Sequence, residues 1–137
     1  MKALITAAAV AALLLFVPAS ATGQAATTPD TAPKYEMAAE VRISGKVLTI
    51  HDRQCPVSGT IGAHFMLEAV GGKVYEVHLA PTKFTKMFDM IFTPGEKVEV
   101  LGNTLVFQGK DAIIAREVKH GNETVTFRDK KGNPSWN

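Results

Sequence analysis

The sequence HFMLEAVGGKVYEVHL, residues 64–79, consists of two arms that alternate apolar and polar side chains around Gly71-Gly72. A period of two is typical of a β-strand that buries one face in a core. The segment therefore predicts a β-hairpin. The core-facing side chains would be Phe65, Leu67, Ala69, Tyr75, Val77 and Leu79.

The length of the turn decides where the two histidines point. An odd loop, Gly71–Lys73, gives both arms one common buried face and places Met66 opposite His78, with His64 as a diagonal neighbour. A two-residue turn would put the histidines on opposite faces and would bring His78 into the core. We therefore expect the odd loop and an outward, water-facing patch of His64, Met66 and His78.

The segments around the hairpin complete a mainly β pattern with one helix. A strand over 39–51 contains Gly45, which predicts a bulge or sharp bend, and the polar segment 51–62 that carries Cys55 reads as a loop. Large apolar side chains recur at helical spacing over 81–92, which predicts a helix that plugs the core; they are Phe84, Met87, Phe88 and Ile91. Further strands are expected over 96–107, 111–119 and 124–128.

The chain ends are expected to lie outside the folded domain. Residues 1–21 combine Lys2, an apolar run and small residues before a cleavage position, which predicts a secretory signal peptide and a periplasmic or secreted protein. That run is short for a membrane span. Residues 22–36 read as a flexible leader, 37–129 as one domain, and 130–137 as a polar tail.

The order of strands and helix predicts an OB-fold-like Greek-key barrel of five to six strands, with the helix between strands three and four. The chain resembles the small exported bacterial OB-fold proteins, the periplasmic group often called the BOF family, over about Met37–Arg128. The resemblance rests on the layout and on Gly45-Lys46-Val47 in the opening strand. It implies ligand binding or stress tolerance in the cell envelope.

Composition and motifs exclude several functions. The formal net charge is only +2 and the charges alternate in sign, whereas nucleic-acid binders cluster Lys and Arg, so we expect no nucleic-acid partner. No phosphate-binding loop or metalloprotease motif occurs, and nothing near Cys55 marks it as an activated nucleophile. We therefore expect a binding or structural protein rather than an enzyme.

The most specific hypothesis is a metal site formed by His64, His78, Met66 and Cys55. Side chains paired across neighbouring strands stand about 5 Å apart and diagonal ones roughly 7 Å, so two imidazoles and a thioether can converge on one ion. Imidazole suits Cu and Zn, and thioether or thiolate suits Cu(I), so two histidines with Met66 and Cys55 would favour copper. Zinc would prefer Cys55 with both histidines and a water or carboxylate. The competing interpretation is that two surface histidines share a polar face by chance.

Other readings stay open at this point. Cys55 is the only cysteine, so it is either a buried inert thiol, part of an intermolecular disulfide or a soft metal ligand. The barrel could also bind a sugar or peptide, or serve as a structural protein, without metal. His51 and His120 lie in turn-like contexts and receive no role.

Overall fold

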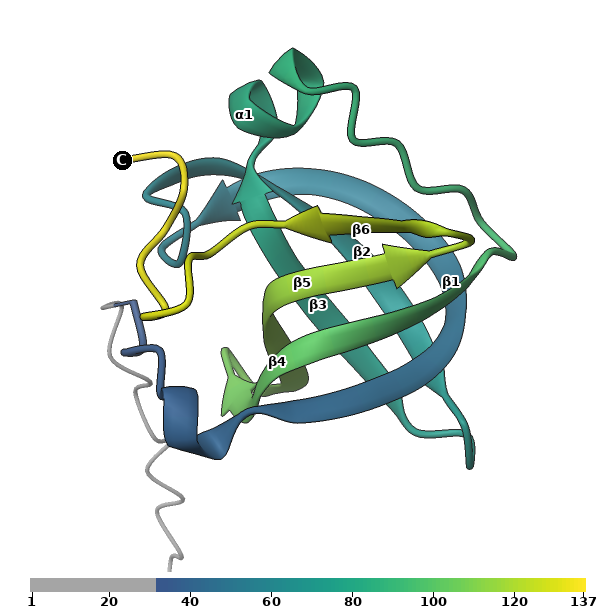
Figure 1. Ribbon diagram of the computed structural model, residues 1–137. Helices are drawn as coiled ribbons and strands as arrows, with labels where there is room; N and C mark the ends of the chain where they lie inside the picture. The colour runs from purple at the N-terminus through teal and green to yellow at the C-terminus, as the bar shows by residue number, and fades with distance from the viewer. Residues whose placement is uncertain (1–31) are drawn as a thin grey trace, which may run out of the picture.

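A computed structural model describes residues 32–137 (Figure 1). The predicted signal peptide and most of the predicted leader lie outside these residues. The elements in chain order are η1 (Met37–Ala39), β1 (Val41–Cys55), β2 (Thr60–Ala69), β3 (Val74–Pro81), α1 (Thr82–Met87), β4 (Lys97–Phe107), β5 (Lys110–His120) and β6 (Glu123–Thr126). Within the described part, no helix is long and apolar enough to cross a membrane.

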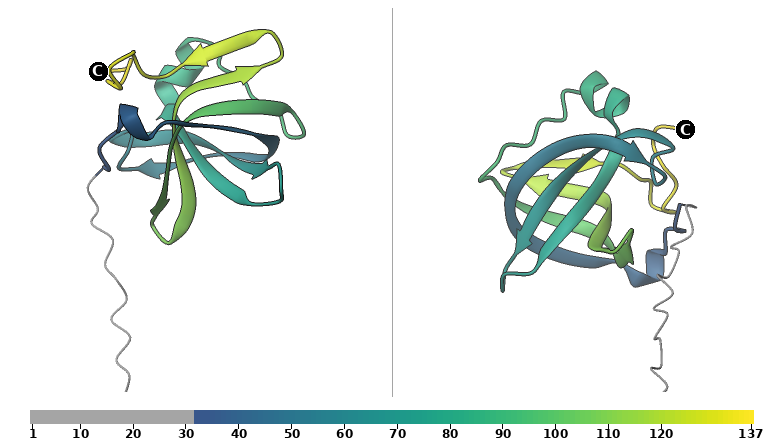
Figure 2. Two further views of the ribbon diagram at one scale, coloured as in Figure 1. Left: turned by 60° about the horizontal axis from the view of Figure 1, so that its bottom comes forward. Right: turned by 180° about the vertical axis from the view of Figure 1, so that it is seen from behind.

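The six strands form one sheet in the order β3-β2-β1-β4-β5-β6, closed by a parallel pairing of β3 with β5. Strand β1 curves around the barrel, as Figures 1 and 2 show. Its first part, Val41–Lys46, pairs with β4, and its second part, from Gly45 to Cys55, pairs with β2. The predicted OB-fold-like barrel, with one helix between β3 and β4, is confirmed.

The bend in β1 differs in detail from the prediction at Gly45. The register shift lies two residues later, between Val47 and Thr49. Gly45 instead allows a close approach, because a Cβ there would collide with the backbone of Glu68 on β2. Gly45 thus lies where β1 ends its pairing with β4 and begins its pairing with β2, and the missing side chain lets β2 come close.

The β2–β3 hairpin has an odd loop, but the pairing is shifted by two residues from the predicted register. The Ala69 N–H donates to the Lys73 carbonyl at 2.8 Å, so the connecting residues are 70–72. His64 therefore pairs with His78, and Met66 pairs with Glu76 rather than with His78. A shift of two residues leaves every side chain on its predicted face.

Residues 81–92 depart most from the predicted structure. The helix spans only Thr82–Met87, and the chain turns at Asp89, whose φ is 47°. Phe92 then enters the core, whereas Met87, Phe88 and Ile91 remain exposed. The prediction that these three residues fill the core was wrong, because the helix ends before its apolar face is complete.

The core lies inside the barrel, between the inner faces of the strands. It contains inward side chains of all the long strands, together with Phe92 and Phe127. Members with no exposed surface include Val47, Phe65, Leu67, Val77, Val100 and Val118. The C-terminal tail closes onto this unit through a bridge between Arg128 and Pro134 and through Trp136, which packs against the core.

Gly102 lies opposite the bulge that β5 forms at Arg116, and it approaches β5 at close range. A Cβ at this position would overlap the carbonyl oxygen of Ile114. We expect Gly102→Ala to lower the free energy of unfolding by about 1–3 kcal/mol, the usual cost of overpacking. Urea unfolding measures the effect, with the neighbouring exposed Thr104→Ala as control. Equal stability of the two variants would contradict the close approach.

Candidate metal centre

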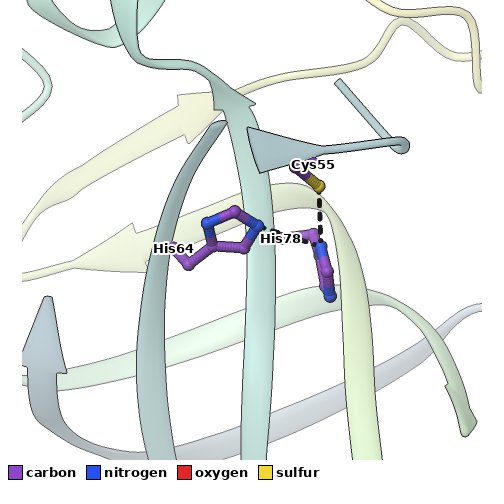
Figure 3. A group of neighbouring side chains, drawn as sticks. All are labelled: Cys55, His64 and His78. Carbon is purple, nitrogen blue, oxygen red and sulfur yellow. Dashed lines mark hydrogen bonds between the residues drawn. The ribbon is translucent and has the colours of Figure 1, made fainter. Parts of the chain in front are cut away.

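Three neighbouring strands bring one thiol and two imidazoles together on the sheet face opposite Phe65 (Figure 3). His64 on β2 and His78 on β3 are directly paired. Cys55 is the last residue of β1, which curls toward the two histidines, and it does not lie in the predicted loop. The strand reaches further than predicted because its backbone stays paired with β2 as far as Cys55–Thr60.

The ligand-type atoms of these residues converge on one point. Cys55 Sγ lies 3.2 Å from His78 Nδ1, and His64 Nε2 lies 3.1 Å from the same nitrogen. All three ligand atoms lie within 4.8 Å of one another. Ligands bound to one zinc-type ion at about 2.0–2.3 Å are separated by roughly 3.4–3.6 Å at tetrahedral angles. The two separations from His78 Nδ1 are thus slightly shorter than in a metal site, and Cys55 Sγ and His64 Nε2 lie within 4.8 Å of each other.

Burial at this site differs from the predicted water-facing patch. The exposed fractions of Cys55, His64 and His78 are 1%, 0% and 1%. The ring of His51 on β1 stacks on His64 at a centroid distance of 5.4 Å, and the ring of Phe107 at the end of β4 packs edge-on against His78 at 5.4 Å. The alternation placed the histidines on the correct face, but tertiary packing removes that face from water.

Burial also sets the protonation of the imidazoles. It lowers the pKa of His64 to about 4. Burial and, to a lesser extent, the neighbouring His64 lower the pKa of His78. Both rings are therefore neutral at pH 7, the state in which imidazole binds a metal.

A buried carboxylate, Glu76, stands behind His78. Its Oε1 lies 3.3 Å from His78 Nε2, which has no aligned hydrogen-bond partner among the described residues. Arg53 donates to Glu76 from two guanidinium nitrogens, and His51 Nε2 lies 3.2 Å from it. Burial raises the pKa of Glu76, but the Arg53 hydrogen bonds and charge outweigh this and bring it down to about 2. The carboxylate is thus ionised and fixed.

This arrangement matches the second shell of many metal sites. A metal-bound histidine commonly directs its other ring nitrogen at a carboxylate, which fixes the tautomer and the ring orientation. Here His78 would bind through Nδ1 while Nε2 faces Glu76. Glu76, Arg53 and His51 were not predicted as part of the site.

A family comparison adds to this geometry. The model of the MamS/MamX magnetosome protein family matches residues 39–125. The chain belongs to this family. The matched range includes Cys55, His64 and His78. No curated protein matches the chain.

Among solved structures, this family member resembles the small single-stranded DNA-binding protein of Streptomyces coelicolor. The identity is 15%, the TM-score 0.49, and the match covers 66% of this chain and 95% of the other. Nothing in these matches supports the resemblance to the BOF group, so the family is MamS/MamX instead.

The structure brings together three of the four predicted ligands. Met66 lies on the same face but pairs with Glu76 and is only partly buried, so its role as a ligand stays a prediction. The sequence held a signal for the missed residues. His51, Arg53 and Cys55 alternate with a period of two, which places all three on one face if the strand continues.

Stability of the metal-free protein should depend on pH through the two buried histidines. Unfolded histidine takes up a proton near pH 6.5, whereas native His64 stays neutral until about pH 4. The unfolded state therefore binds more protons in this window. We expect the free energy of unfolding to fall between pH 7 and pH 5 by up to about 1.4 kcal/mol per pH unit for each histidine.

Denaturant titrations at several pH values with a chelator present measure this slope. The slope should reach half of its full value near pH 6.5, approach the full value about one pH unit lower, and vanish well above pH 6.5. His120→Ala, which removes a histidine outside the site, should keep most of the slope. Constant stability from pH 7 to pH 5 would contradict neutral buried imidazoles.

Proposed function

We propose that the protein binds a single transition-metal ion through Cys55 Sγ, His64 Nε2 and His78 Nδ1. The approach of Cys55 Sγ and His64 Nε2 to His78 Nδ1, at 3.2 and 3.1 Å, in a site closed to water carries the proposal. Thiolate and imidazole are ligands for Zn and Cu.

Hydrogen bonding alone gives a poorer account of the cluster. His78 Nδ1 has two close neighbours, Cys55 Sγ and His64 Nε2, yet a ring nitrogen offers either one proton or one lone pair. Leaving buried polar atoms unpaired costs about 1–3 kcal/mol each. A metal ion would satisfy all three converging donors at once.

The site favours binding over catalysis. The space beside the ligands, lined also by Ser58, Gly62 and Leu79, does not admit a water-sized sphere. Catalytic metal sites keep an open position for water or substrate. The proposal is therefore a metal-binding protein without enzymatic activity, exported if the signal at residues 1–21 is cleaved as expected.

Metal uptake by the purified chain tests the proposal. Titration with Zn(II) and with Cu(I) should give one ion per chain, and the double variant His64→Ala/His78→Ala should lose this uptake. His120→Ala is the matched control, because His120 pairs with Glu96 away from the site and should bind as the parent does. Equal uptake by the double variant and the parent would end the proposal and favour a sugar- or peptide-binding module.

Glu76 should tune the site without being a ligand. We expect Glu76→Gln to weaken metal binding by about 10–100-fold, the usual effect of removing a second-shell partner of a histidine. Competition with a chromophoric chelator measures the affinity. Glu68→Gln, on an exposed position of β2, should change nothing. Unchanged affinity in Glu76→Gln would show that the carboxylate does not support His78.

A further inference from the structure

We infer that the ion at the Cys55–His64–His78 site is copper in the +1 state, held by three ligands. The inference rests on the proposed function and names the metal of that site. Two independent properties of the site support it, the number of ligands and the charge balance, and the chemical softness of the ligand set is consistent with it.

The site offers three ligands and little room for a fourth. Within residues 32–137, the group of close histidine, cysteine and acidic side chains contains only Cys55, His64 and His78. Glu76 lies beside the far nitrogen of His78 and so stands away from the converging atoms. No water-sized space adjoins the ligands. Zn(II) sites are almost always four-coordinate, whereas Cu(I) is stable with three ligands, so the site is short of one ligand for zinc.

The charge balance also favours a monovalent ion. A metal-bound imidazole is neutral and a metal-bound cysteine is a thiolate, so Cys55 would contribute the only charge of the ligand set. The nearby Glu76 carboxylate is already balanced by Arg53. Cu(I) with one thiolate gives a neutral centre, whereas Zn(II) or Cu(II) would leave a net positive charge in a buried place. An uncompensated buried charge is strongly unfavourable.

The donor atoms themselves narrow the choice of metal. Thiolate is a soft ligand that suits Cu(I) as well as Zn(II), and imidazole binds both ions, so the ligand set favours these ions over hard cations such as Mg²⁺ and Ca²⁺. Among residues 32–137, the cluster of converging atoms contains no carboxylate oxygen.

Competition and X-ray absorption test the inference on the full chain. In anaerobic titrations against chromophoric chelators, Cu(I) should bind one to one and at least 100-fold more tightly than Zn(II). The copper absorption edge should indicate Cu(I), with one sulfur and two nitrogen ligands at short distance. Cys55→Ser should lose the sulfur ligand, while His120→Ala should retain the parent spectrum.

The outcomes separate this inference from the proposed function. Tighter binding of Zn(II) than of Cu(I), or a four-coordinate copper centre with an oxygen ligand, would overturn the inference and leave the metal site standing. Absence of binding for both ions would overturn the proposed function itself.

Discussion

Replacing Cys55 with serine is expected to weaken metal binding by more than 100-fold and to abolish the stabilisation that the metal provides. The thiolate supplies the only negative charge in the ligand set, and a serine hydroxyl stays protonated and binds soft metals poorly. An ion present at 100 times its Kd stabilises the native state by about 2.7 kcal/mol. Chemical unfolding with and without the ion measures this gain, which should be near zero in Cys55→Ser.

The same variant provides its own check on folding. Cys55 is 1% exposed and contacts His78 Nδ1, and a serine hydroxyl can donate to that nitrogen. Without metal, Cys55→Ser should therefore keep its stability within about 1 kcal/mol. If the variant gained as much stability from metal as the parent, Cys55 would not be a ligand.

The sequence correctly predicted that His64 and His78 lie on the same face of the β2–β3 hairpin. Alternation along a strand assigns each side chain to one of two faces, and an error of two residues in register does not change the face. His64 and His78 thus share a face in the predicted hairpin and in the actual one, where they pair directly. Met66, which was predicted to pair with His78, pairs with Glu76 instead.

Burial of that face could not be predicted from the hairpin alone. It depends on β1, which continues through His51 and Arg53 to Cys55, and on Phe107, which arrives from β4. These contacts join residues far apart in the chain. Pro56, Gly59 and the polar residues after His51 favoured a loop locally. Pairing with β2 extends β1 as far as Cys55, and the turn is confined to residues 56–59.

Helical spacing misled the prediction over 81–92 for a related reason. Phe84, Met87, Phe88 and Ile91 would share a face only if the helix continued through all of them. The helix ends at Met87, and the positive φ of Asp89 redirects the chain. Only Phe84 of the four packs against the core, and Phe92, which the periodicity leaves out, is buried instead.

Phe92→Ala should therefore destabilise the protein by about 3–5 kcal/mol, the usual cost of removing a buried phenylalanine ring. Phe92 is 6% exposed, and its ring packs against Phe65 at a centroid distance of 5.3 Å. The neighbouring Ile91 is 71% exposed, so Ile91→Ser should change the free energy of unfolding by no more than about 0.5 kcal/mol.

Urea unfolding of these two variants decides between the helical pattern and the observed chain path. A continuous helix over residues 81–92 would bury Ile91 and expose Phe92, and it would reverse the order of the two effects. The pair is well matched, since both positions lie in the same non-helical segment before β4 and each substitution removes a large apolar side chain. A larger loss in Ile91→Ser than in Phe92→Ala would therefore contradict the path of the chain between α1 and β4.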